Sequence, residues 1–193
     1  MMKKIKNMKG FTLIELLAVI VILGILLAIA VPSITKYISS SRKNTFISNV
    51  KQYMDSARTE ALAGSYAFPT SNSEATVIKF DTIRPLLEKG GKTSPYDGIW
   101  EASNCYVVIV NEGTAEAPHY VYYVAARDDK GYGLGANATT PSLIEYNSLK
   151  SDYVIQLNSG KALSTDASSI TGSIIEDDYS GSTPRTLTIT HTY

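Results

Sequence analysis

The sequence predicts an α+β protein in which one long N-terminal helix packs on an antiparallel β-sheet. Apolar residues recur at mostly helical spacings from Phe11 to about Ala63. After residue 104 the pattern changes to short runs rich in Val, Ile and Tyr, separated by Gly, Pro and Asn. A sheet packed on the amphipathic half of the helix is the simplest way to bury both apolar surfaces. The 193 residues suit one globular domain on an anchor.

The N-terminal region combines a basic leader with a long apolar segment. The leader contains no acidic residue and four lysines, which are Lys3, Lys4, Lys6 and Lys9. The apolar segment behind it carries a single charge, Glu15. A helix of about 20 residues spans about 30 Å, the thickness of the hydrocarbon core of a bilayer. We therefore expect a leader at 1–10, a membrane-spanning half-helix at 11–32 and a globular domain at 33–193.

The second half of the predicted helix carries one apolar stripe. Its members are Ile34, Ile38, Ile47, Val50, Met54, Ala57 and Ala61, with Tyr37, Phe46 and Tyr53 beside them. The helix is expected to end at Gly64, because glycine adopts the left-handed conformation that closes many helices. Gly24 and Pro32 are expected to weaken it, since proline lacks the N–H that would bond to residue 28. Pro32 is compatible both with a functional kink and with a proline that a membrane helix tolerates.

Four segments are predicted to form the sheet. They are Cys105–Val110, His119–Ala126, Tyr153–Leu157 and Leu187–Thr192. The first is an almost unbroken apolar run and is expected to be a central strand. Residues 65–103 are expected to form a connecting region with one short helix at Ile83–Glu88. Residues 162–185, rich in Ser, Thr, Asp and Gly, are expected to form a surface excursion.

The composition limits the classes of function. The formal charge is zero, and removal of the leader lysines would leave 14 basic against 18 acidic side chains, a charge of −4. This balance argues against nucleic-acid binding by the domain as a whole. The one cysteine, Cys105, cannot form an internal disulfide and is expected to be a small buried hydrophobic residue.

Motifs typical of enzymes and cofactor sites are missing from the sequence. There is no G-x-S-x-G motif and no pair of cysteines to hold zinc. Gly91-Lys92-Thr93 lacks the first glycine of a phosphate loop, because that position is Leu86. His119 and His191 are expected to be ordinary sheet residues. We therefore expect a protein that is not an enzyme and that holds no cofactor.

Two further features have competing interpretations. Asp128 and Asp129, followed by Gly131, form a candidate calcium loop, but their spacing fits no full template, and we expect no metal site. Trp100 is expected to be a packing anchor rather than a ligand-stacking residue.

The residues that open the apolar segment form a specific motif. Lys9-Gly10-Phe11-Thr12-Leu13-Ile14-Glu15 resembles the prepilin cleavage and methylation motif of type IV pilins and of the pseudopilins of type II secretion and competence systems. The resemblance covers roughly residues 1–62, including Gly24 and Pro32. It implies a pilin fold, cleavage after Gly10 by a prepilin peptidase, N-methylation of Phe11, and packing of the helix into a filament core.

The motif also makes chemical sense. Cleavage between Gly10 and Phe11 would expose one ammonium group in an apolar setting. Buried charges are tolerated mainly as pairs, so the new terminus and Glu15 are expected to neutralise each other. Within one helix the two groups lie four residues apart. Between neighbouring helices the pair would fix the register of one subunit against the next, a role that the resemblance implies.

The resemblance implies a structural subunit of a type IV pilus that serves surface adhesion or motility. Its partners would be copies of itself, other pilins, the peptidase and N-methyltransferase, the assembly platform and the membrane. The protein would lie in the cytoplasmic membrane before assembly and in an extracellular pilus afterwards. The single cysteine and the Lys-rich leader favour a Gram-positive bacterial host.

Three other interpretations remain open. The chain is also compatible with a pseudopilin of a type II secretion or DNA-uptake system and with a membrane-anchored surface protein that never polymerises. Ala28-Ile29-Ala30 would suit an ordinary signal peptide and release of a secreted enzyme after Ala30. Against that reading, the apolar segment exceeds the usual length of about 7–15 residues and would contain Glu15.

Overall fold

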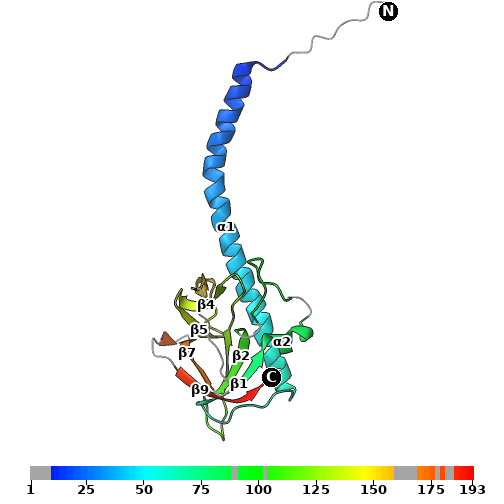
Figure 1. The fold of residues 1–193 in the computed structure, drawn as a ribbon, viewed down its shortest axis with the longest axis vertical. Helices are drawn as coiled ribbons and strands as arrows, with labels where there is room; N and C mark the ends of the chain where they lie inside the picture. The colour runs from blue at the N-terminus through cyan, green and yellow to red at the C-terminus, as the bar shows by residue number, and fades with distance from the viewer. Residues whose placement is uncertain (1–9, 88–90, 102–103, 159–168, 177–178, 181–184) are drawn as a thin grey trace, which may run out of the picture. The chain divides into compact units, whose positions relative to one another are not determined.

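Most of the chain can be followed in the computed structural model, which describes residues 10–87, 91–101, 104–158, 169–176, 179–180 and 185–193. The chain divides into two units, Met1–Ser40 and Ser41–Tyr193. Helix α1 (Leu13–Leu62) contains residues of both units, whereas the sheet belongs wholly to the second (Figure 1).

The predicted long helix is confirmed, and so is its end at Gly64. Gly64 has a φ of 87°, the left-handed conformation that glycine adopts without steric cost. Its N–H donates to the carbonyl of Ala61 at 3.0 Å, and the N–H of Ser65 donates to the carbonyl of Glu60 at 3.0 Å. These two bonds define a Schellman motif, which satisfies carbonyl groups that the helix leaves without partners.

The part of α1 in the second unit packs on one face of the sheet through an apolar stripe. The buried members are Phe46, Ile47, Val50, Tyr53, Met54, Ala57 and Ala61. The predicted stripe is therefore correct from residue 46 onward and wrong before it, since Ile34 and Ile38 are exposed. Trp100 is buried and packs edge-on against Phe46, with ring centroids 4.8 Å apart. Its predicted role as a packing anchor is confirmed.

Nine strands form the sheet within the part of the chain that the structure describes. They are β1 (Glu74–Lys79), β2 (Tyr106–Asn111), β3 (Tyr120–Ala125), β4 (Tyr132–Asn137), β5 (Thr140–Glu145), β6 (Val154–Gln156), β7 (Ser169–Glu176), β8 (Tyr179–Ser180) and β9 (Arg185–Thr192). Their order is β6-β4-β5-β3-β2-β1-β9-β7-β8, with an additional pairing of β5 with β7. The pairing of β5 with β7 closes six strands, β5-β3-β2-β1-β9-β7, into a ring.

The sheet is mixed rather than purely antiparallel. Most neighbours are antiparallel, but β1 pairs in parallel with β9, and β5 pairs in parallel with β7. The expected α+β class, with a long helix packed on an antiparallel-rich sheet, is confirmed.

Two apolar clusters explain why β2 is buried on both faces. Val107 and Ile109 belong to the cluster that includes the stripe of α1. Tyr106, Val108 and Val110 alternate with them and belong to a second cluster formed by residues of the ring strands. A strand covered on both faces reads as a continuous apolar run, so the prediction of a central strand is confirmed.

The predictions for strands β3, β6 and β9 are confirmed within a few residues, whereas those for two other regions are wrong in part. The connecting region contains β1, which was not predicted, followed by α2 (Phe80–Ile83) and the 3₁₀ turn η1 (Arg84–Leu86). The short helix thus begins before Ile83, and the end of the predicted segment lies outside the described residues. The expected surface excursion at 162–185 instead contributes β7 and β8, and its remaining residues up to 184 lie outside the described ranges.

Candidate functional site

The Gly10-Phe11 junction lies in an exposed, non-helical segment directly before α1. The Phe11 side chain is 91% exposed. A Cβ atom added to Gly10 would meet no heavy atom within 4 Å beyond its chain neighbours. Backbone outside regular structure is the preferred place for proteolysis, and glycine lets an enzyme approach the backbone closely. The local structure therefore leaves this peptide bond accessible.

Thr12 and Glu15 form a reciprocal capping box at the start of α1. The Thr12 N–H and the Thr12 hydroxyl each donate to Glu15 Oε2 at 2.8 Å, and the Glu15 N–H donates to Thr12 Oγ1 at 3.3 Å. This arrangement satisfies backbone donors that lack partners within the helix. The box was not predicted from the sequence, although the pattern Thr-x-x-Glu before an apolar run is its signal.

The two oxygens of the Glu15 carboxylate have different surroundings. Both donors from Thr12 reach Oε2, whereas no group among the described residues donates to Oε1. The carboxylate is exposed. Oε1 is thus free to accept a hydrogen bond from another group while the capping box stays intact.

The part of α1 in the first unit exposes an unusually apolar surface. Its exposed large apolar residues are Leu13, Ile14, Leu16, Leu17, Val19, Ile20, Val21, Ile22, Leu23, Ile25, Leu26, Leu27, Ile29, Val31, Ile34, Tyr37 and Ile38. The helix is long and apolar enough to cross a membrane, and its most apolar window has no residue buried within the chain. Exposed apolar surface of this extent indicates a partner that is itself apolar, such as lipid or other helices.

Gly24 and Pro32 do not interrupt α1. The helix is continuous through both positions, and a Cβ on Gly24 would meet nothing within 4 Å. Pro32 cannot donate to the carbonyl of residue 28. Near it, Thr35 donates its hydroxyl to the carbonyl of Val31 at 2.9 Å, an additional bond that often accompanies bends in helices.

Cys105 is buried and chemically quiet. Its Sγ donates to the carbonyl of Arg127 at 2.9 Å, and burial raises the pKa of the thiol to about 12. A thiol in this state is neutral and a poor nucleophile at physiological pH. The expectation of a small buried hydrophobic residue is confirmed.

The carboxylates of Asp128 and Asp129 accept hydrogen bonds that connect neighbouring segments of the fold. Asp128 is fully buried, and its carboxylate accepts hydrogen bonds from the Ser94 hydroxyl and from the N–H groups of Lys130 and Tyr132, the last at 2.8 Å. Asp129 Oδ1 accepts the N–H of Ile99 at 2.8 Å. Within the described ranges, no three His, Cys, Asp or Glu side chains are grouped to hold a metal ion. Both carboxylates of the candidate calcium loop thus accept hydrogen bonds from neighbouring segments of the chain.

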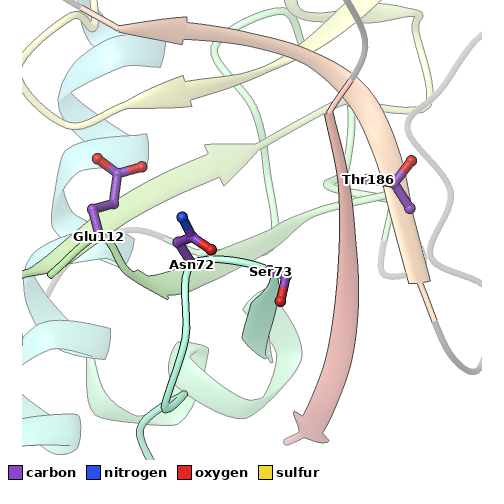
Figure 2. A pocket seen from close by; sticks show the side chains of 4 residues that line it. All are labelled: Asn72, Ser73, Glu112 and Thr186. Carbon is purple, nitrogen blue, oxygen red and sulfur yellow. The ribbon is translucent and has the colours of Figure 1, made fainter. Parts of the chain in front are cut away.

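One polar pocket lies on the sheet domain. Figure 2 shows four described residues that line it, Asn72 and Ser73 before β1, Glu112 after β2, and Thr186 on β9. The single carboxylate, Glu112, accepts a hydrogen bond from the Tyr123 hydroxyl at 2.8 Å. Among the described residues that line the pocket, Glu112 is the one ionisable side chain, so these residues supply no acid–base pair.

Comparison with known proteins identifies the N-terminal motif. Residues 5–31 match the family described as the prokaryotic N-terminal methylation motif. A fimbrial protein of Pseudomonas aeruginosa is 34% identical over 89 residues, which cover 46% of this chain and 58% of that protein. The type IV major fimbrial protein FimA of Dichelobacter nodosus is 44% identical over 59 residues, which cover 31% of this chain and 38% of that protein. No solved structure matches.

The chain thus spans less than two thirds of the length of the relatives it matches. The similarity to the type IV pilin family that the motif indicates is nevertheless confirmed. The relatives are named as fimbrial proteins, not as enzymes. They do not support the expectation of a Gram-positive host.

Proposed function

From this similarity to type IV pilins, we propose that the chain is a structural subunit of a type IV pilus that serves surface adhesion or motility. The exposed apolar half of α1 directly behind the methylation motif is the observation that supports it most strongly. Before assembly this half-helix would lie in the cytoplasmic membrane, and after assembly it would pack among the same helices of other subunits. In this proposal the chain consists of a leader at 1–10, a membrane half-helix at 11–32 and a headgroup at 33–193.

Processing is proposed at the Gly10-Phe11 bond. A prepilin peptidase would cut after Gly10 and the new amino group of Phe11 would be methylated. The exposed, non-helical junction supports this, because the bond can enter an active site without unwinding α1. Cleavage would also remove all four leader lysines, which otherwise anchor the leader on the cytoplasmic side.

The mass of the mature N-terminus tests this step. Protein purified from its own host is expected to begin at Phe11 and to carry one additional methyl group on its amino nitrogen. Intact-mass measurement and sequencing of the N-terminal peptide would decide. A mature terminus at Val31, or a chain that retains Met1, would contradict the proposal.

Glu15 is proposed to set the register between subunits. Oε2 is engaged by Thr12, and Oε1 is left for the Phe11 ammonium of its own or a neighbouring subunit. Apolar side chains hold helices together but specify register poorly, whereas one ion pair in a low-dielectric core specifies it well. Removal of one partner of a buried pair costs about 3–5 kcal/mol, because the other charge stays buried without a partner.

Two substitutions at Glu15 test this role. Glu15→Ala is expected to insert in the membrane and to be cut after Gly10, but not to form filaments by itself. Glu15→Gln keeps the shape without the charge and is expected to be nearly as defective. Shear fractions and electron microscopy would show the outcome, and co-expression with the parent chain should restore part of the incorporation.

Thr12→Ala is the matched control. It removes the side-chain half of the capping box but keeps the Glu15 charge. Loss of a cap costs about 0.5–2 kcal/mol, which weakens the helix start without removing the ion pair. Filaments at close to the parental level in Thr12→Ala, with none in Glu15→Ala, would support register over capping. Parental filament levels in Glu15→Ala would refute the role.

A further inference from the structure

The sheet domain contains a modification signal that the assembly function does not use. Asn137-Ala138-Thr139 is the only Asn-x-Ser/Thr tripeptide in the sequence, which contains nine asparagines. Its middle residue is alanine, which satisfies the requirement that this position not be proline. This tripeptide is the acceptor sequence for N-linked glycans, which attach to surface loops of exported proteins.

The tripeptide lies at the tip of the hairpin that joins β4 to β5. Asn137 is the last residue of β4 and is paired with Thr140, so Ala138 and Thr139 form the turn. All three residues of the tripeptide are exposed. The carbonyl of Ala138 accepts the N–H of Asn158 at 2.8 Å, which fixes the tip against the end of β6. A large group on Asn137 would therefore extend into solvent without displacing a packed side chain.

Within the tripeptide, the side chain of Asn137 is hydrogen-bonded to Thr139. Asn137 Oδ1 accepts the Thr139 N–H at 3.0 Å and the Thr139 hydroxyl at 2.7 Å. Both bonds engage the oxygen of the amide. Nδ2, the atom that would carry a glycan, has no hydrogen-bond partner among the described residues. Thr139 therefore engages the amide oxygen of Asn137, whereas the amide nitrogen of Asn137 is available for a reaction.

We propose that Asn137 is an N-glycosylation site. A membrane-bound oligosaccharyltransferase would supply the sugar from a lipid pyrophosphate-linked oligosaccharide. Asn137 Nδ2 would attack the anomeric carbon, forming the N–C1 bond while the bond from C1 to the pyrophosphate oxygen breaks. The lipid pyrophosphate leaves with the bonding electrons, and one proton passes from Nδ2 to a base of the transferase. No oxidant or reductant is needed.

The inference rests on the proposed orientation, in which the leader stays in the cytoplasm and the headgroup crosses the membrane. The oligosaccharide donor and the transferase act on the side of the membrane opposite the cytoplasm. Asn137 therefore reaches them only if the residues after α1 are exported. Failure of the glycosylation proposal can be distinguished from failure of the pilus proposal. The N-terminal peptide of the tryptic digest described below shows independently whether the leader has been removed.

Peptide mass analysis of the full chain from its own host tests the site. Trypsin should release the peptide Gly131–Lys150, which contains both Asn137 and Asn147. We expect this peptide to carry a hexose- or hexosamine-containing mass increase that fragmentation places on Asn137. Asn147, followed by Ser148 and Leu149, lies outside any acceptor tripeptide and is the internal control.

Three variants sharpen the test. Asn137→Gln and Thr139→Ala are each expected to abolish the mass increase, whereas Thr139→Ser keeps the hydroxyl and is expected to retain it. Ser and Ala are both small residues at this exposed turn. A difference in glycosylation between the two Thr139 variants would therefore be due to the hydroxyl group and not to a change in the fold. An unmodified Asn137 in protein whose N-terminus is correctly processed overturns the inference. A mass increase that persists in Thr139→Ala overturns it as well.

Discussion

At the scale of single residues, Asp128 stabilises the turn between β3 and β4. Its buried carboxylate receives three donors, two of them backbone N–H groups from Lys130 and Tyr132. Burial raises the pKa of Asp128 above its ordinary value, even though these hydrogen bonds favour the ionised form. Burial of the Asp128 carboxylate costs free energy, but its hydrogen bonds satisfy backbone N–H groups that would otherwise be buried without an acceptor.

Substitution of Asp128 should separate these two effects. Asp128→Ala leaves buried donors without an acceptor, which costs about 1–3 kcal/mol for each such group. Asp128→Asn keeps an acceptor oxygen and removes the charge, so its loss of stability at neutral pH should be much smaller. Urea denaturation at pH 7 would measure both. Asp129→Asn is the matched control at an exposed position and should change stability least.

The same residue predicts the sign of a pH dependence. With a raised pKa, the folded state holds the proton at pH values where the unfolded state has lost it. Stability from this group is therefore full below the ordinary pKa of aspartate and declines as pH rises through the folded pKa. Asp128→Asn should remove this decline. A decline of the same size in parent and variant would assign it to other groups.

At the scale of elements, the accuracy of the sequence prediction depends on how local the signal is. Helix α1 was predictable because its apolar periodicity and the glycine that ends it, Gly64, are visible within one continuous stretch of sequence. The capping box at Thr12 and Glu15 has an equally local signal, Thr-x-x-Glu, but was not predicted. The methylation motif is contiguous, so the candidate site could be predicted from consecutive residues. That Thr12 engages only one of the two Glu15 carboxylate oxygens could be seen only in the structure.

Strands β4 and β5 show why other elements were not predictable. Gly133 and Pro141 lie inside them and are typical of turns in a sequence. The structure explains Gly133, because a Cβ there would lie 2.7 Å from the carbonyl oxygen of Ala126. That oxygen accepts the N–H of Leu134 at 2.9 Å, so the two backbones must approach closely. The reason for glycine is thus a contact between distant segments, which no local pattern reveals.

The end of α1 gives a test at this scale. Gly64 has a positive φ and empty space around its missing side chain, so a substitution acts only through the backbone. Gly64→Ala should destabilise the headgroup by about 1 kcal/mol, and Gly64→Asn by less, because Asn tolerates the left-handed conformation better. Urea denaturation of the headgroup fragment would measure both. Equal losses for the two variants would show that something other than φ controls this position.

At the scale of the whole chain, closure of the strand ring is the feature furthest from sequence prediction. The last strand, β9, lies between β1 and β7, and its partners come from opposite ends of the headgroup sequence. Tyr193 continues the contact, since its N–H donates to the carbonyl of Val77 and its carbonyl accepts the N–H of Lys79, each at 2.9 Å. Such pairings depend on all six strands at once, whereas β2 and β3 could be predicted from their own residues.

These closures predict that residues 33–193 fold without the apolar part of α1 that precedes them. Among the described residues, both apolar clusters consist of residues from Phe46 onward, and every strand of the ring lies after Ser41. A fragment of residues 33–193 should therefore be soluble and monomeric, with mixed helix and strand by circular dichroism and protected amides in β2. A matched fragment that ends at residue 184 lacks β9, opens the ring and exposes the edges of β1 and β7. It should lose amide protection and aggregate. Disorder in the 33–193 fragment itself would show that the preceding part of α1 is needed for the fold.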